Sequence, residues 1–248
     1  MKLEKNNTGN FYSKIHKELI DNLDHNPPQG LKELFHFLKK QKIKSKALDA
    51  GCGFGQIIYL LNKAKFKKIF SIDINPDAKK FITKKYGNIT KHKTASVTLM
   101  PFKKNNFNFV VCYGVLHHTN DLEKGISEIH RVLKKNGKAI IGLYTFKNSF
   151  FHIIVSTLRL ISKIIPYGLS SFILKLFCGV HLKNFILDHM YVPILNTYYD
   201  KDIIKKLSNK FKVIKSKPCD YDFFQKTFLK KIITGDGLFR MYFIKKIS

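Results

Sequence analysis

The sequence contains no tryptophan, few acidic residues and only four cysteines. The cysteines (Cys52, Cys112, Cys178 and Cys219) are far apart and form no Cys-x-x-Cys pair, so neither a disulfide framework nor a zinc site is indicated. We therefore expect reduced thiols, a cytoplasmic protein and no bound metal. A chain of 248 residues can bury a large core without such cross-links.

Arginine is also scarce. Only three of the 45 basic residues are arginine, and with 17 acidic residues the formal net charge is +28. Such a charge is typical of proteins that bind nucleic acid or anionic membranes. Nucleic-acid surfaces, however, favour arginine for bidentate phosphate and base contacts. Since 22 phenylalanines and no tryptophan suggest AT-rich codons, we favour a solvated lysine surface over a dedicated polyanion partner.

Long hydrophobic runs are missing as well. The first ten residues are polar and do not resemble the apolar core of a signal peptide. The most apolar stretch, residues 150–182, is interrupted by basic residues, Pro166 and Gly179. No window of about 20 residues is therefore apolar enough to cross a bilayer, and we expect no membrane span.

The hydrophobic pattern alternates between strands and helices after two lead-in helices at 13–24 and 31–41. We expect strands at 46–50, 68–73, 93–95, 107–113 and 138–144, helices at 56–63, 76–86 and 121–133, then a helical insert, a helix at 200–208 and strands at 211–216 and 239–245. This order predicts an α/β fold: a Rossmann-like, doubly wound, seven-stranded and mostly parallel sheet. The helical insert precedes the last two strands, and the final strand is expected to join as a hairpin.

A glycine-rich loop, Gly51-Cys52-Gly53-Phe54-Gly55, follows the first predicted strand. Glycines at such a turn let a ligand approach the backbone closely, and Asp73 at the end of the second strand can accept hydrogen bonds from ribose hydroxyls. The spacing is not the Gly-x-Gly-x-x-Gly of dinucleotide sites, and Asp49 would repel a pyrophosphate. These features favour S-adenosylmethionine (SAM), a cationic adenosine without phosphates, over a nicotinamide cofactor.

Four ordered segments resemble motifs of the class I SAM-dependent methyltransferases. They are residues 48–55, 70–74, 100–118 and 128–138, so that the resemblance covers roughly 47–144. The nearest branch contains quinone-biosynthesis and small-molecule methyltransferases. The resemblance implies an enzyme that transfers a methyl group from SAM.

The resemblance also implies nine cofactor-binding residues: Asp49, Gly51, Gly53, Gly55, Asp73, Ile74, Ser96, Val97 and Tyr113. The glycines would shape the loop under the methionine end of SAM, where Asp49 would hold the ammonium group. Asp73 would bind the ribose hydroxyls and Ile74 would pack on the adenine. Ser96 stands where family members usually have aspartate, so its contact with the adenine amino group is expected to be weaker.

Candidate acceptor-site residues are fewer. Methyl transfer mainly requires alignment, and a base is needed only if the acceptor must lose a proton. His117 and His118 follow the fourth predicted strand, and His117 is our candidate base, although such a pair can simply cap the strand. Tyr12 and its neighbour Phe11 would either fold over SAM or pack in the core. We interpret Asp188-His189 and Tyr198-Tyr199-Asp200 as helix ends, and His152 as a packed or pocket-lining residue.

We divide the chain into four parts: lead-in helices (1–45), a SAM-binding core (46–145), a helical insert over the acceptor site (146–199) and a C-terminal helix with the last strands (200–248). The insert is interpreted as a plain lid, or else as an apolar mouth for a lipid or quinone. In the second case Arg159, Lys163 and Lys175 would contact an anionic membrane surface.

The leading functional hypothesis is methylation of a small-molecule acceptor, with O-methylation slightly preferred and an apolar or lipid-like acceptor as one option. One alternative is an RNA methyltransferase that uses the basic surface. It lacks support from arginine content, and Cys112-Tyr113-Gly114-Val115 stands where an amine-binding Asn-Pro-Pro-Tyr-like tetrad would be expected. The other alternative is a non-catalytic binding protein, which would not need the intact glycine loop and Asp73.

Overall fold

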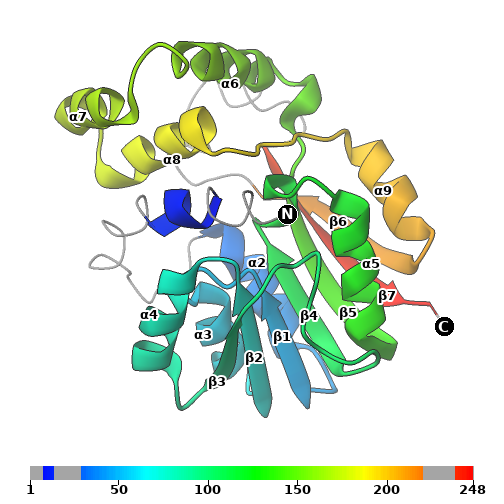
Figure 1. The fold of residues 1–248 in the computed structure, drawn as a ribbon. Helices are drawn as coiled ribbons and strands as arrows, with labels where there is room; N and C mark the ends of the chain where they lie inside the picture. The colour runs from blue at the N-terminus through cyan, green and yellow to red at the C-terminus, as the bar shows by residue number, and fades with distance from the viewer. Residues whose placement is uncertain (1–7, 14–28, 220–237, 248) are drawn as a thin grey trace.

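The computed structural model describes residues 8–13, 29–219 and 238–247. Within these residues one seven-stranded sheet has the order β3-β2-β1-β4-β5-β7-β6 (Figure 1). The strands are β1 (Lys46–Ala50), β2 (Lys68–Asp73), β3 (Thr90–Thr94), β4 (Phe107–Tyr113), β5 (Leu133–Tyr144), β6 (Phe211–Pro218) and β7 (Phe239–Lys246). Strands β1 to β5 are parallel, whereas β7 is antiparallel to both of its neighbours.

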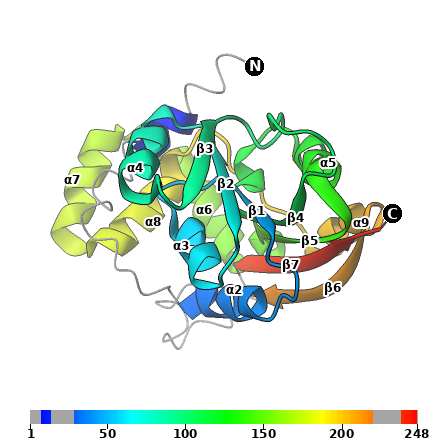
Figure 2. The same cartoon turned by 90° about the horizontal axis from the view of Figure 1, so that it is seen from below.

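Helices cover both faces of the sheet (Figure 2). On one face lie α2 (Gln29–Lys39), α3 (Gln56–Lys63) and α4 (Pro76–Tyr86), and on the other lie α5 (Leu122–Val132) and α9 (Asp200–Ser208). Each face has its own hydrophobic core, because alternate residues of a strand point to opposite sides. Val111 thus packs toward α3, while Val110 packs toward α5. The predicted doubly wound, seven-stranded fold is confirmed.

Several predicted boundaries need correction. Strand β3 is Thr90–Thr94 rather than 93–95. It is an edge strand with the sequence Thr-Lys-His-Lys-Thr, so its exposed polar side chains concealed its start. Strand β5 begins at Leu133 rather than at residue 138. Asn136 (φ 62°) lies in an irregular part of that strand, where the register with β4 shifts.

The N-terminal helix predicted at 13–24 lies almost wholly outside the described residues. Residues 8–13 are helical, and the second lead-in helix ends at Lys39, two residues before its expected end. The helical insert contains α6 (Phe150–Ile161), α7 (Tyr167–Phe177) and α8 (Val180–Tyr191), which lie together at one end of the sheet (Figure 1). Among the helices that the structure describes, none has the length and apolar character needed to span a membrane.

Candidate active site

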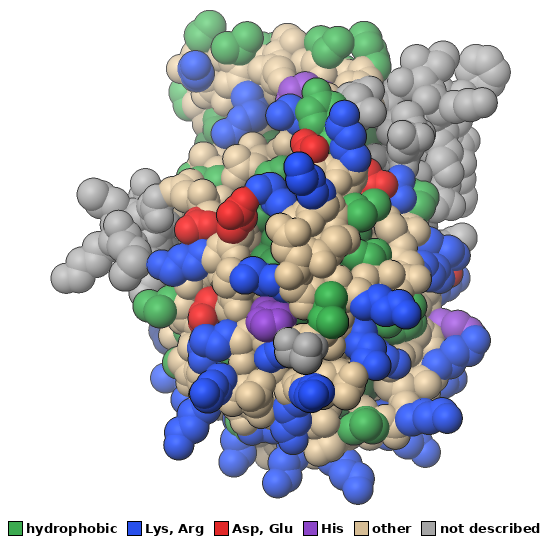
Figure 3. Space-filling model, turned by 90° about the vertical axis from the view of Figure 1, so that its right-hand side faces the viewer, with side chains coloured by type: hydrophobic (Ala, Val, Ile, Leu, Met, Phe, Trp, Pro, Cys, Tyr) green, Lys and Arg blue, Asp and Glu red, His purple; other side chains and the backbone are tan. Residues whose placement is uncertain are grey.

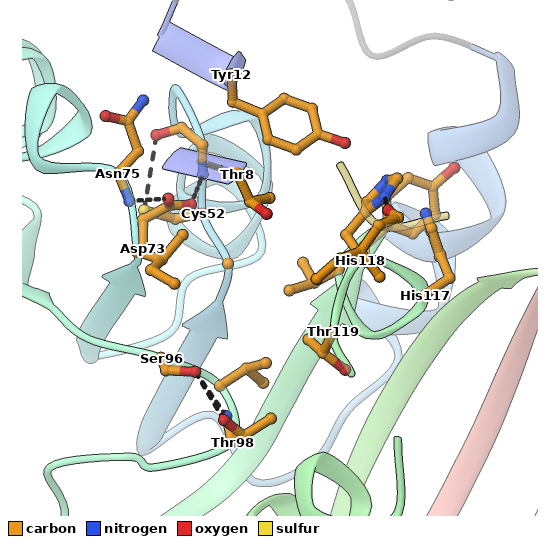
Figure 4. A pocket seen from close by; sticks show the side chains of 18 of the residues that line it. Thr8, Tyr12, Cys52, Asp73, Asn75, Ser96, Thr98, His117, His118 and Thr119 are labelled. Atoms are coloured by element: carbon orange, nitrogen blue, oxygen red, sulfur yellow. Dashed lines mark hydrogen bonds between the residues drawn. The ribbon is translucent and has the colours of Figure 1, made fainter. Parts of the chain in front are cut away.

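A cavity of about 490 Å³ lies where the carboxyl ends of the parallel strands meet the insert. Its wall is formed by the loops after β1, β2, β3 and β4, by the end of β5, and by residues from 8–13 and the insert (Figure 4). The residues that line the cavity include Thr8, Tyr12, Gly51, Gly53, Asp73, Ile74, Asn75, Ser96, Val97, Tyr113, Gly114, His117, His118, Tyr144, Asp188, Ile194 and Phe239. This edge is where ligands bind in doubly wound sheets, because the strand-to-helix loops gather there.

The three loop glycines meet different structural requirements. Position 51 (φ 91°) requires a glycine, because a Cβ there would lie 2.2 Å from Val115 Cγ2. Gly55 (φ 89°) precedes α3, and a Cβ there would lie 2.5 Å from the ring of Tyr86. Gly53 (φ 48°) lines the cavity, and a Cβ there would have no neighbour within 4 Å. Two glycines therefore allow close packing, while Gly53 keeps the backbone open to a ligand.

Asp73 connects the ends of β1 and β2. Its Oδ2 accepts a hydrogen bond from the backbone N–H of Gly53, and its Oδ1 accepts one from Asn75, both at 2.8 Å. Burial raises the pKa of this carboxyl group, while these backbone amides act to lower it. Each carboxylate oxygen retains a second lone pair, so Asp73 can fix the loop and still accept the hydroxyls of a ribose.

Asp49 lies beneath the loop and is 1% exposed. Neither carboxylate oxygen has a hydrogen-bond partner among the described residues. Burial raises the pKa of Asp49 well above its usual value and the neighbouring Asp73 raises it further, while the backbone of Ile58 acts to lower it. A buried carboxylate without a partner is costly, and a nearby cation would relieve that cost. The orphaned carboxylate therefore fits the ammonium group of SAM, and its place below the cavity wall suits contact through water.

The adenine side of the predicted site is formed by Ile74, Ser96 and Val97, all of which line the cavity. Ser96 Oγ lies 2.8 Å from Thr98 Oγ1 and accepts a hydrogen bond from the Thr98 backbone N–H at 3.2 Å. The backbone N–H of Ala95 donates to the carbonyl of Asp73, which ties this loop to β2. Ser96, which stands where the family usually has aspartate, is thus held in place by Thr98 and lines the cavity.

Of the nine predicted cofactor residues, seven line the cavity: Gly51, Gly53, Asp73, Ile74, Ser96, Val97 and Tyr113. The other two do not line it: Asp49 is buried in β1, and Gly55 precedes α3. The Tyr113 ring packs against Phe239 with 4.8 Å between ring centroids, and its hydroxyl lies 3.6 Å from Cys219 Sγ. Sequence reasoning missed Asn75 and Gly114, although Gly114 directly follows a predicted strand and Asn75 lies two residues after another.

The opposite end of the cavity contains the His117–His118 pair. His117 is 1% exposed, its ring centroid lies 4.2 Å from that of Tyr144, and its Nδ1 has no hydrogen-bond partner among the described residues. Burial, together with His118, lowers the pKa of His117 well below its usual value. His118 Nδ1 lies 2.8 Å from the Ile194 carbonyl oxygen, which only accepts, so we assign the ring proton to Nδ1. Burial lowers the pKa of His118 to about 4.

Asp188 on α8 reaches this end of the cavity, together with Tyr12. The Tyr12 hydroxyl donates to Asp188 Oδ1 at 3.0 Å, and the Tyr12 and His118 ring centroids are 5.4 Å apart (Figure 4). Burial raises the pKa of Asp188, while His189, Tyr12 and Arg159 act to lower it. Asp188 therefore contributes to the cavity, whereas the sequence pattern had suggested only a helix end.

The helical turn 8–13 bridges the two ends of the cavity. Ser13 Oγ donates to Asn75 Oδ1 at 2.8 Å beside the cofactor end, while Tyr12 contacts Asp188 at the other. Phe11 packs edge-on against Tyr167 of α7, with ring centroids 6.4 Å apart. Of the two positions considered for Phe11 and Tyr12, Tyr12 thus lies over the cavity and Phe11 packs on the insert.

The residues present fit SAM. A buried carboxylate without a partner lies below the loop, a second carboxylate lines the cavity beside an open glycine, and a side chain at Gly53 or Gly114 would project into free space. Two carboxylates close to a glycine loop suit a cationic adenosine and disfavour a pyrophosphate.

Comparison with known proteins gives an independent result. Residues 48–141 match the family model described as "Methyltransferase domain". The human mitochondrial arginine-hydroxylase NDUFAF5 is 38% identical over 102 residues, which are 40% of this chain and 28% of that protein. A demethylmenaquinone methyltransferase from Chlorobaculum parvum is 33% identical over 96 residues, 39% of each chain. The chain thus matches less than half the length of these curated relatives.

Among solved structures, the 1,6-didemethyltoxoflavin-N1-methyltransferase of Burkholderia thailandensis, with bound 1,6-didemethyltoxoflavin and S-adenosylhomocysteine, has a TM-score of 0.61. The likeness covers 97% of this chain and 87% of that one at 13% sequence identity, and it shows a common fold. Three observations point to the same kind of protein: the matched family model, the fold shared with a methyltransferase, and the unpartnered carboxylate of Asp49 under the glycine loop. Residues 48–141 thus match a methyltransferase domain, and the site that they form fits SAM as the cofactor.

Proposed function

We propose that the whole chain transfers a methyl group from SAM to a hydroxyl group of a small acceptor with an apolar body. The observation that carries this proposal is the acceptor end of the cavity. There a neutral histidine, His118, lies beside Tyr12, and aromatic and aliphatic side chains (Tyr144, Ile194 and Phe239) line the same wall. Such a pocket binds an apolar molecule and directs one polar group toward a few fixed partners.

When bound, SAM supplies an electrophilic methyl group on its sulfonium. The chain binds it through Asp49 and Asp73, and the loop glycines allow close approach. His118 Nδ1–H donates to the Ile194 carbonyl, which fixes the ring and leaves Nε2 free of a proton. In this proposal Nε2 accepts the hydroxyl proton of the acceptor. The low pKa keeps His118 neutral near pH 7, so it is always ready to accept, although it is a weak base.

His118 thus takes the role that the sequence analysis gave to His117. The His117 ring lies 4.1 Å from the ring of His118 and is enclosed by aromatic side chains. We assign it a positioning role, because its contacts restrict where the His118 ring can lie. Proton acceptance is worth about a hundredfold to ten-thousandfold in rate, and alignment of the two reactants supplies much of the remainder.

The test is a screen of apolar hydroxyl compounds with methyl-labelled SAM, followed by the His118→Asn variant. Asparagine keeps a donor for the Ile194 carbonyl but has no proton-accepting nitrogen. We expect kcat to fall by about a hundredfold or more while S-adenosylhomocysteine affinity stays unchanged. The exposed His36 on α2 provides the matched control, His36→Asn, which should leave both quantities unchanged.

The same assay separates the competing functions. Mass spectrometry of the product distinguishes an added methyl group from an added oxygen, the change implied by the name of the human arginine-hydroxylase relative. A product that gains oxygen would contradict the proposal and indicate a hydroxylase. Methylated RNA, with no small compound modified, would contradict it in favour of an RNA methyltransferase. Binding of SAM without turnover on any acceptor would favour the non-catalytic alternative. An unchanged kcat in His118→Asn would remove the histidine from the mechanism.

A further inference from the structure

The helix α7 exposes its apolar side. Five of its large hydrophobic residues recur at the spacing of a single helix face and are exposed: Leu169 (51%), Phe172 (61%), Ile173 (41%), Leu176 (64%) and Phe177 (81%). Among the residues of α7, only Ser170 is buried. In globular proteins such a face normally packs against the core. Here it points away from α8, the helix against which α7 packs.

The exposed apolar surface continues onto α6 and the connection to α7. Phe150, Ile153, Leu160 and Ile161 are 38–61% exposed along the outer side of α6, and Ile164 in the connection is 84% exposed. We call these residues together with those of α7 the outer face of the insert. Figure 3 shows hydrophobic side chains gathered at the same end of the molecule, at its top. Contiguous apolar patches of more than a few hundred Å² usually mark a binding surface.

The charges near the outer face have one sign. Lys163 follows α6 and Lys175 lies within α7, and both side chains are exposed. Residues 146–199 contain one acidic residue, Asp188, whose carboxylate lies at the cavity and bonds to Tyr12. The outer face is thus apolar and bordered by lysines, and residues 146–199 contribute no acidic side chain to it.

We propose that the outer face of the insert binds the surface of an anionic lipid bilayer, with α6 and α7 lying in the headgroup region. Exposed leucine, isoleucine and phenylalanine with flanking lysines are what interfacial helices use: the apolar side chains enter the acyl boundary and the lysines meet anionic headgroups. A second copy of the chain fits less well, because its own outer face brings the same lysines and each copy has a formal charge of +28.

This surface lies on the insert, and the insert also forms the acceptor end of the cavity through Asp188 and Ile194. Docking would therefore bring that end of the cavity to the membrane. Only this consequence rests on the proposed function, since the docking itself rests on the exposed residues and their charges.

The test is flotation of the full chain with vesicles of phosphatidylcholine alone or mixed with phosphatidylglycerol. We expect binding to the anionic vesicles, weakening as salt is added. The variant Ile164→Ser/Phe172→Ser/Phe177→Ser should lower the partition coefficient by about thirtyfold or more, since it removes three large exposed apolar side chains. The control Ile43→Ser/Ile214→Ser/Ile247→Ser removes isoleucines exposed elsewhere and should leave binding unchanged.

A second variant pair tests the charges. Lys163→Gln/Lys175→Gln should weaken binding to anionic vesicles by about 25-fold, because each lysine near such a surface contributes about fivefold. Lys67→Gln/Lys84→Gln removes the same charge from exposed positions before β2 and on α4, and should have a smaller effect. Unchanged S-adenosylhomocysteine affinity in every variant verifies that the fold is retained.

Three outcomes would overturn the proposal. The first is absence of vesicle binding by a chain that still binds S-adenosylhomocysteine. The second is equal binding to neutral and anionic vesicles, which would leave the lysines without a role. The third is a dimer in sedimentation velocity that the triple serine variant of the outer face converts to monomer, because a second copy would then cover this face. Since no acceptor is used, a failed acceptor screen does not affect the result.

Discussion

The two ends of the cavity are constructed in different ways. The cofactor end is made of short loops after β1, β2 and β3, and backbone hydrogen bonds such as that from Gly53 to Asp73 hold it together. The acceptor end is assembled from distant segments: Tyr12 bonds to Asp188, 176 residues away, and His118 bonds to Ile194. The first end carries the carboxylates Asp49 and Asp73, and the second combines neutral histidines with the carboxylate of Asp188. Local structure thus forms the cofactor end, and tertiary packing forms the end proposed for the acceptor.

The largest expected difference between the two ends is a loss of folding stability in acid, caused by protonation of His118 at the acceptor end. Its pKa is lowered from 6.5 to about 4 in the folded protein, first by burial and also by Arg159. The unfolded chain therefore binds the proton more readily between these values, so stability is complete above pH 6.5 and is lost as pH falls toward 4. For one histidine the loss is up to about 3 kcal/mol.

Urea unfolding across this pH interval measures the effect. His118→Asn should lose up to about 3 kcal/mol less than the parent protein on acidification, because it has no ring to protonate. His117 and His189, whose pKa values are also lowered by burial, keep part of the pH dependence in both proteins. His36→Asn, at an exposed position, should follow the parent curve. Parallel curves for all three proteins would show that His118 is not buried in neutral form.

The next effect concerns the cofactor end. Asp73→Ala removes the carboxylate that both accepts the Gly53 and Asn75 backbone amides and faces the ligand space. We expect the affinity for S-adenosylhomocysteine to fall by about a hundredfold, the value of two hydrogen bonds to a charged group. Isothermal titration calorimetry gives the ratio. Asp77→Ala, at an exposed residue of α4, is the control, and equal losses in both variants would contradict this role for Asp73.

The third effect has opposite signs for stability and binding. Asp49→Asn replaces the buried, unpartnered carboxylate with a neutral group. We expect the free energy of unfolding near pH 7 to rise by about 1–2 kcal/mol, and SAM affinity to fall by about tenfold because the ammonium group loses its counter-charge. The exposed Asp202 on α9 offers the matched Asp202→Asn control. A variant that is less stable, or that binds SAM as tightly as before, would refute the assignment of Asp49.

The contrast between the two ends also explains what the sequence could predict. The bounds of β1, α3 and β4 agree with the predictions because their apolar runs are flanked by clear turn residues. The glycine loop and Asp73 were predictable because their function depends on a short spacing along the chain. The Tyr12–Asp188 contact was not, since it depends on where the insert packs. Likewise, the periodicity of α7 is the same for a buried face and an exposed one, so only the structure shows that it faces outward.

The smallest effect would sharpen the comparison within the cofactor end. Ser96→Asp restores the residue usual in the family at the adenine edge. Aspartate can still accept from the Thr98 backbone N–H, as Ser96 Oγ does at 3.2 Å, so the loop should keep its shape. A carboxylate accepts from the adenine amino group more strongly than a hydroxyl, and we expect about a threefold gain in S-adenosylhomocysteine affinity. The analogue in which hypoxanthine replaces adenine lacks that amino group, so its affinity should not rise. A gain shared by both ligands would instead show that the added carboxylate acts without contacting the adenine amino group, and that group would then be recognised elsewhere in the loop.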